Sequence, residues 1–141
     1  MNLYAESSAI LAWLLDEASA SNVRRLLSDA EIIVASDLTL IECDRVLIRA
    51  ITLGELTEAE GADRRALLSS AASHWHVLRI AQEVVDRARR PFPDEPIRTL
   101  DAIHLASTLT ARSAITGLAL LSLDDRVRRA ARKLGIEVLP H

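Results

Sequence analysis

The sequence predicts an α/β protein: a three-layer α/β/α sandwich around a central, mainly parallel five-stranded sheet. Short apolar runs that are typical of buried strands alternate along the chain with segments of helical periodicity. Five strands separated by helices favour parallel pairing, with both faces of the sheet covered. The right-handed crossover rule then places helices on both sides of the sheet.

The first third of the chain predicts two strands and three helices. The apolar run at 2–5 is the first strand, and Ser7 and Ser8 after it are candidate caps for a helix. The β-branched run at 31–35 predicts the second strand, ended by Ser36. The helices of this part are expected over residues 9–15, 18–28 and 38–53, and Gly54 stands where a helix commonly ends.

The rest of the chain continues the alternation. Thr57 and Glu60 form a capping-box pattern that opens a helix to about residue 72. Prolines 91, 93 and 96 predict an irregular loop between two further helices. Strands are expected over 75–80, 118–123 and 136–139, and helices over 81–90, 100–110 and 124–134.

Composition limits the function classes. The chain has 141 residues, 50% of them hydrophobic, and a formal net charge of −3, which fits one domain over residues 1–141. The single cysteine, Cys43, excludes a disulfide framework and a Cys-based metal cluster. No G-x-G-x-x-G occurs, which argues against a dinucleotide-binding fold. Without a secretory signal or a long apolar stretch, the protein is expected to be cytoplasmic, with no membrane contact.

Acidic residues lie where the predicted strands end. Glu6 directly follows the first strand, Glu42 lies one turn into the helix after the second, and Asp124 follows the strand at 118–123; Asp101 opens the helix after the proline-rich loop. Ligands of open parallel sheets bind at this edge. Four carboxylates with no intervening Lys cannot all stay ionised at close range without a cation. Such hard oxygen ligands suit Mg²⁺ or Mn²⁺, which activate water for phosphodiester cleavage.

Each of these residues also has a structural interpretation, and the sequence leaves both open. Asp101 and Asp124 can cap their helices. Glu42 can be an exposed residue paired with Arg45, whereas Glu6 is hardest to explain as solvated surface. His104, one turn after Asp101, either holds a carboxylate or packs in the core.

A basic segment follows the last acidic residue. Residues 126–133 hold five bases and no acid, which makes them either a solvated helix face or a surface that binds phosphates. The candidate RNA-binding residues are Arg98, Arg126, Arg128 and Arg129.

Four segments resemble a known family. They read LYAESSAIL from residue 3, LTLIE from residue 38, RTLDAIHLA from residue 98 and LLSLD from residue 120. In order and spacing they are similar to the motifs of PIN-domain proteins, particularly VapC-type toxins of toxin–antitoxin pairs, and the third is the most specific. The resemblance covers nearly the whole chain.

The resemblance implies a PIN-like fold and a metal-dependent endoribonuclease that uses Mg²⁺ or Mn²⁺ and metal-activated water. Carried over by motif position, the acidic quartet is Glu6, Glu42, Asp101 and Asp124, and Ser7 is the hydroxyl residue beside the first acid. The implied partners are the RNA substrate, a cognate VapB-type antitoxin that wraps apolar helices, and a second copy in a homodimer.

One residue departs from the family pattern, which normally has Asp at the position of Glu6. The longer side chain keeps the charge but shifts the oxygen atoms, and small misplacements are costly in catalysis. The alternative function is therefore a catalytically impaired PIN-like module that binds RNA or an antitoxin. A phosphoacceptor or phosphatase domain is a third hypothesis, disfavoured because the only lysine, Lys133, lies late in the basic helix.

Overall fold

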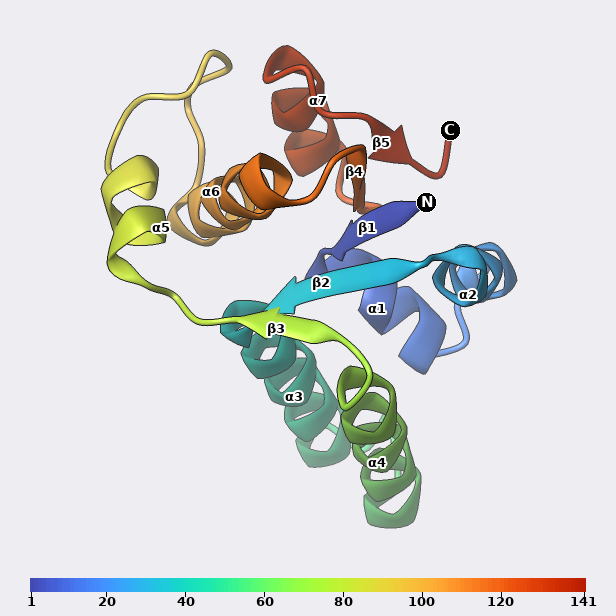
Figure 1. Cartoon of the computed structure of the whole chain (residues 1–141). Helices are drawn as coiled ribbons and strands as arrows, with labels where there is room; N and C mark the ends of the chain where they lie inside the picture. Colours follow the sequence, from blue (N-terminus) through green and yellow to red (C-terminus); the bar gives the residue numbers. More distant parts are fainter.

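Five parallel strands form a single sheet in the computed structural model, which describes residues 1–141. The strands are β1 (Asn2–Ala5), β2 (Ile32–Ser36), β3 (His76–Leu78), β4 (Leu118–Leu121) and β5 (Val138–Leu139). Their spatial order is β3-β2-β1-β4-β5, so the first strand of the chain is the central one (Figure 1). The predicted sheet is confirmed.

Seven helices cover the two faces of this sheet. They are α1 (Ser7–Leu14), α2 (Ala20–Asp29), α3 (Asp37–Thr52), α4 (Glu58–Ala72), α5 (Gln82–Ala88), α6 (Thr99–Ala114) and α7 (Asp125–Lys133). Figure 1 shows α6 and α7 on one side of the sheet and α1 and α2 on the other, which is the three-layer arrangement that the sequence predicts.

Side chains of β1 alternate between the two layers, as the period of a strand requires. Tyr4 packs in one core cluster with Leu120 of β4 and Leu105 of α6. Its neighbour Leu3 packs in another cluster, with Leu121 of β4 and Val23 of α2. Because β1 is buried on both faces from Leu3 to Ala5, these residues pack in the core, and the carboxylate that follows them, Glu6, lies at the end of the sheet.

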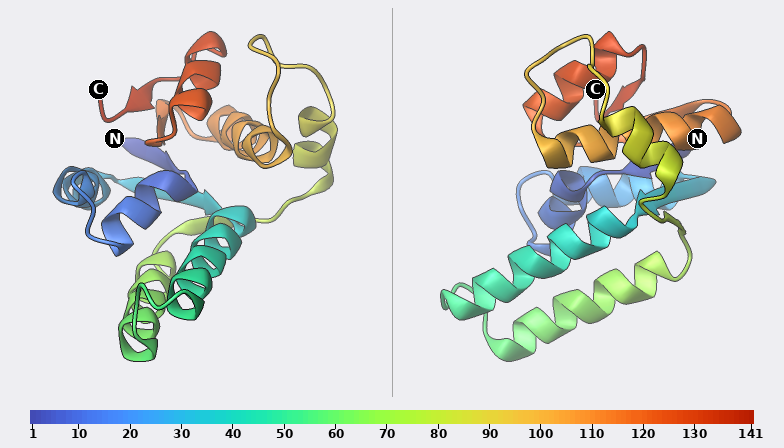
Figure 2. Two further views of the ribbon diagram at one scale, coloured as in Figure 1. Left: turned by 180° about the vertical axis from the view of Figure 1, so that it is seen from behind. Right: turned by 90° about the vertical axis from the view of Figure 1, so that its left-hand side faces the viewer.

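Helices α3 and α4 form a hairpin that extends beyond the sheet (Figure 2). The turn between them begins at Gly54, whose φ of 75° is a conformation that glycine adopts without strain. Gly61 of α4 lies against Ile51 of α3, and a Cβ there would collide with the isoleucine side chain. The base of the hairpin is fixed to α1, because Cys43 and Leu68 share a core cluster with residues of that helix.

The predicted elements all exist, with shifts at their ends. The last three strands are shorter than expected, so Ser122 and Leu123 belong to the loop before α7 rather than to β4. Helix α6 runs four residues further than the predicted end at residue 110, to Ala114. The predicted capping box forms at Thr57 with Glu60, and a second one forms at Ser36 with Thr39. The N-cap of α1 is Glu6 and neither Ser7 nor Ser8, because the Glu6 carboxylate accepts from the backbone N–H of Ser8. No helix has the length and apolar character needed to cross a membrane.

Candidate metal centre

The first acidic residue, Glu6, is fixed at the end of the central strand. Its backbone N–H donates to the carbonyl of Leu121 in β4 at 3.0 Å, and it is the N-cap of α1. Oxygen Oε2 accepts hydrogen bonds from the backbone N–H of Ser8 at 3.1 Å, from the Ser8 hydroxyl and from the Ser122 hydroxyl at 2.8 Å. The side chain is therefore buried with one oxygen engaged, and Oε1 remains to face the site.

Glu42 comes from the second turn of α3 and meets Glu6 through His104. Its Oε1 accepts a hydrogen bond from the Ser7 hydroxyl at 2.8 Å and contacts Nε2 of His104. The same ring nitrogen lies 3.9 Å from Oε1 of Glu6. One ligand atom from each of Glu6, Glu42 and His104 lies within 4.8 Å of the others. Residues from three separate segments thus converge at the carboxyl end of β1.

The His104 ring is held from behind by Tyr4. Nδ1 lies 3.0 Å from the Tyr4 hydroxyl, which donates to Oγ of Ser36 at 3.0 Å. The two rings meet edge to face, with centroids 6.0 Å apart and planes at 74°. Only 1% of His104 is exposed. The two sequence interpretations of this residue therefore both apply: it packs in the core, and it holds a carboxylate.

Asp101 and Asp124 form a second pair, separate from the Glu6, Glu42 and His104 group. Arg98 links them, with Nε 3.2 Å from Oδ2 of Asp101 and Nη2 3.8 Å from Oδ2 of Asp124. Asp124 also caps α7, because its Oδ1 accepts hydrogen bonds from two backbone N–H groups of that helix. This is the structural role that the sequence left open for it. The Ser8 hydroxyl connects the two groups, since it contacts Glu6 and accepts from the N–H of Asp124 at 3.1 Å.

The comparison with known proteins identifies the family. A model of the PIN domain matches residues 3–133. The chain belongs to the PIN-domain family. It is 37% identical over 137 residues to Ribonuclease VapC46 of Mycobacterium tuberculosis, an alignment that covers 97% of this chain and 95% of that protein. It is also 27% identical over 139 residues to Ribonuclease VapC35 of the same species, again with 97% and 95% covered.

Solved structures share the fold of this PIN domain at low sequence identity. A toxin–antitoxin complex from Klebsiella pneumoniae matches with a TM-score of 0.67 at 16% identity, over 99% of this chain and 97% of that one. Mycobacterium tuberculosis VapC20, a Sarcin-Ricin loop cleaving toxin, matches with a TM-score of 0.64 at 15% identity, over 91% and 94%. FitAB bound to an IR36 DNA fragment matches with a TM-score of 0.68 at 13% identity, over 100% and 99%.

The two glutamates of the PIN domain have pKa values shifted in opposite directions. Burial raises the pKa of Glu6, and the nearby His104 and the serine hydrogen bonds offset this only in part. Burial also raises the pKa of Glu42, but the hydrogen bonds from His104 and Ser7 outweigh it and leave that pKa below its ordinary value. Of the two glutamates, Glu6 is therefore the one whose ionised form would gain more from a bound cation.

The donor set fits a divalent cation. Two carboxylates and an imidazole approach one another closely, and carboxylate oxygens are the ligands that Mg²⁺ and Mn²⁺ prefer. Glu6 is 6% exposed and is 3.9 Å from the nearest nitrogen of His104, so its charge is incompletely balanced by the protein alone. A buried carboxylate in this position favours binding of a cation.

The candidate RNA-binding arginines have different surroundings. Arg98 and Arg126 line a cavity of about 400 Å³ beside Asp101. Arg129 lines the same cavity and is paired with Asp94, with Nε and Oδ2 3.0 Å apart. The guanidinium of Arg128 instead donates to the carbonyls of Ser122 at 2.7 Å, Leu139 at 3.2 Å and Pro140 at 2.7 Å, so it anchors the end of the chain. Its guanidinium is thus engaged by the protein's own backbone, unlike those of the other three arginines.

Three polar residues of the site are not among the sequence candidates. The sequence predicts that Tyr4 is part of an apolar strand, that Ser8 is a helix cap and that Ser122 lies near the end of the fourth strand. The sequence feature that could have identified them is their position next to the strand ends. A hydroxyl that is buried there needs a polar partner, and the acids lie nearby. Arg98 is a candidate for RNA contact, and the sequence does not show that it pairs with two of the acids.

Proposed function

We propose that this single-domain PIN protein is a metal-dependent endoribonuclease that acts on cytoplasmic RNA as the toxin of a VapBC-type toxin–antitoxin pair. The observation that carries the proposal is the convergence of Glu6 and Glu42 on His104 at the carboxyl end of the central strand. The identity of 37% with a mycobacterial protein named as a ribonuclease, over nearly the whole chain, supports it.

The cofactor in this proposal is Mg²⁺ or Mn²⁺, as one or two ions. Glu6 and Glu42, which converge at His104, and the neighbouring Asp101–Asp124 pair are the residues that would hold it. When bound, the cation supplies positive charge that polarises the scissile phosphate and lowers the pKa of water. The protein orients the carboxylates: Ser8 and Ser122 fix one oxygen of Glu6, and Ser7 and His104 fix Glu42. Arg98 and Arg126 face the side from which phosphates would approach.

Cleavage of structured RNA in Mn²⁺ by the purified chain tests this function. We expect cleavage by the natural chain, its loss when EDTA removes the cation, and a fall of on the order of 100-fold in Asp101→Ala, because an acid of the proposed site is lost. Asp44→Ala is the matched control, since this exposed carboxylate pairs with Arg65 on the α3–α4 hairpin. Equal cleavage by the natural chain and Asp101→Ala, or cleavage by neither, would count against the proposal.

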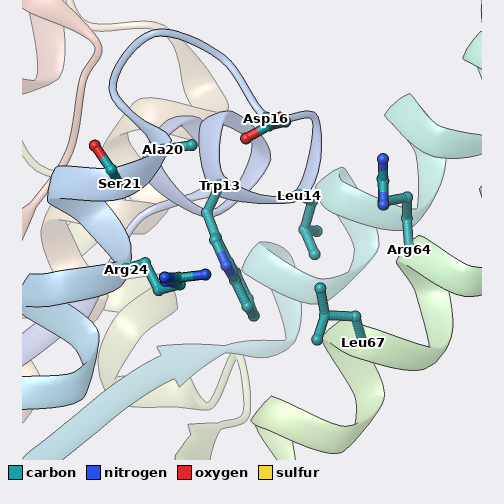
Figure 3. A pocket seen from close by; sticks show the side chains of 8 residues that line it. All are labelled: Trp13, Leu14, Asp16, Ala20, Ser21, Arg24, Arg64 and Leu67. Carbon is teal, nitrogen blue, oxygen red and sulfur yellow. The ribbon is translucent and has the colours of Figure 1, made fainter.

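A groove between α1, α2 and α4 is the candidate surface for the antitoxin. Figure 3 shows the ring of Trp13 between Arg24 of α2 and Leu67 of α4. Nε of Arg64, on the rim, is buried without a hydrogen-bond partner. An apolar floor flanked by two arginines fits an amphipathic segment that carries carboxylates. We expect Leu67→Asp to weaken co-elution with the product of an adjacent antitoxin-like reading frame, and Ile80→Asp, on another surface, to leave it unchanged.

The homodimer is part of the same proposal. Exposed large apolar side chains lie on α3 at Ile41 and Val46, at Leu53 directly after that helix, and on α6 at Leu100. Such side chains are costly to leave in water and are available to a second copy. Light scattering of the purified chain should give a mass twice that of the monomer, and Ile41→Asp should reduce it.

A further inference from the structure

The guanidinium of Arg98 faces both carboxylates of the Asp101–Asp124 pair. It lies 3.2 Å from Asp101, in the first turn of α6, and 3.8 Å from Asp124, the N-cap of α7. These are two of the four acids that the proposed function assigns to the cation. One positive side chain of the protein therefore already faces two of the four acids and offsets one of their two negative charges.

The oxygens that Arg98 faces are the ones that a cation would need. Oδ1 of Asp124 is engaged, because it accepts from the backbone N–H groups of Arg126 at 2.9 Å and Val127 at 3.1 Å. Oδ2 remains for a cation, and it is the atom nearest to Arg98. Arg98 likewise faces Oδ2 of Asp101. Because a divalent ion and a guanidinium repel each other at such distances, the two compete for these oxygens.

The side chain of Arg98 can leave the two carboxylates without unpacking the core. It is 62% exposed, whereas that of Asp101 is 16% exposed, and it follows the proline-rich loop at the start of α6. Because the guanidinium end of both ion pairs is open to water, which screens the interaction, a cation can replace Arg98 at low cost. The neighbouring cavity, lined also by Arg126 and Arg129, gives the guanidinium a place to move.

We propose that Arg98 is an ion-pair partner of Asp101 and Asp124 that a divalent cation displaces. In the metal-free protein its guanidinium partly balances the charge of these carboxylates. It gives up their Oδ2 atoms to the cation and then binds an RNA phosphate beside them. The planar guanidinium suits phosphate geometry. This inference rests on the proposed function and adds a coupling to it: cation and RNA each improve the binding of the other through one side chain.

Calorimetric titration of Mn²⁺ into the purified full chain tests the first half of the inference. Arg98→Ala should bind Mn²⁺ about two- to fivefold more tightly than the natural chain, because a competitor is removed. Arg98→Lys should show a smaller gain, since its ammonium keeps the charge. Arg126→Ala is the matched control: it removes the same charge from the same cavity, but that side chain pairs with no carboxylate. No gain in Arg98→Ala, or an equal gain in Arg126→Ala, overturns the exchange.

Binding of a labelled 2′-O-methyl RNA, with its intactness checked on a gel, tests the second half. In the natural chain, Mn²⁺ should tighten RNA binding severalfold. Arg98→Ala should lose that gain, and Arg126→Ala should bind RNA more weakly with and without Mn²⁺ while keeping the gain. An undiminished gain in Arg98→Ala overturns the coupling. Neither measurement requires turnover, so a chain that fails to cleave RNA refutes the proposed function and leaves the coupling testable.

Discussion

The Tyr4 hydroxyl lies 3.0 Å from Nδ1 of His104, while Nε2 of the same ring contacts Glu42. A buried residue of the central strand thus reaches a carboxylate of the candidate site through one imidazole. Groups that hold a metal-site ligand from behind fix its orientation and commonly affect metal affinity as well as stability.

Tyr4→Phe should therefore lower both properties. It leaves Nδ1 of His104 and Oγ of Ser36 without their buried partner, which should cost about 1–3 kcal/mol in the free energy of unfolding. Mn²⁺ affinity should fall by on the order of tenfold. The control is Thr108→Val, which removes a hydrogen bond to the His104 carbonyl and leaves the ring contacts in place. Denaturant titration and calorimetry separate the effects: an equal loss of Mn²⁺ affinity in both variants would show that Tyr4 acts through stability alone.

Glu6→Gln should stabilise the metal-free protein at neutral pH. Burial raises the pKa of Glu6 in the folded state above its ordinary value of 4.5, so the folded protein binds more protons than the unfolded one in that range. Stability contributed by this residue is consequently lost as pH rises from about 4.5 through the raised pKa. The melting temperature of the variant should exceed that of the natural chain by roughly 2–5 °C at pH 7 and by less at pH 4. A variant that melts lower at pH 7 would contradict this account.

Glu6→Asp distinguishes an active ribonuclease from an impaired binding module. In the natural chain the longer side chain reaches Ser8 and Ser122 with one oxygen and directs the other toward His104. Shortening it by one methylene should break these contacts and slow cleavage roughly 10- to 100-fold, as a misplacement of about 1 Å does. A large gain in cleavage rate would instead mark the natural protein as impaired.

Cys43 should be unreactive in the folded protein. Its side chain is fully buried, and burial, together with the nearby Glu42, Glu6 and Asp44 carboxylates, raises the pKa of the thiol. The thiolate that reacts with alkylating agents is therefore scarce even at alkaline pH. Iodoacetamide labelling followed by mass spectrometry at pH 8.5 should detect modification only after denaturation. Rapid labelling of the native protein would contradict the burial.

Arg128→Ala should destabilise the fold much more than Arg129→Ala. The first substitution leaves the carbonyls of Ser122, Leu139 and Pro140 without their charged donor, at a cost of about 1.5–3 kcal/mol. The second removes only an exposed pair with Asp94, worth about 0–1 kcal/mol. Urea titration of both variants measures the difference, and similar midpoints would show that Arg128 does not anchor the chain end.

The sheet and the positions of the candidate acids could be predicted from the sequence because both depend on local pattern. Apolar runs mark the strands, and the rule that ligands of parallel sheets bind at the carboxyl ends of the strands singles out Glu6, Glu42 and Asp124. The side-chain contacts follow from three-dimensional packing, which no local pattern contains. No pattern in the sequence shows that His104 contacts both glutamates or that Arg98 lies between the two aspartates.

The order β3-β2-β1-β4-β5 has a consequence for synthesis on the ribosome. Glu6 leaves the ribosome before the other acids of the candidate site. The strand that pairs with β1 on one side is β4, however, and Ser122, which follows β4, donates a hydrogen bond to the Glu6 carboxylate. The nascent chain therefore cannot complete its acidic centre until its last strands have left the exit tunnel. A partial translation product that lacks β4 and Ser122 should accordingly lack the assembled site.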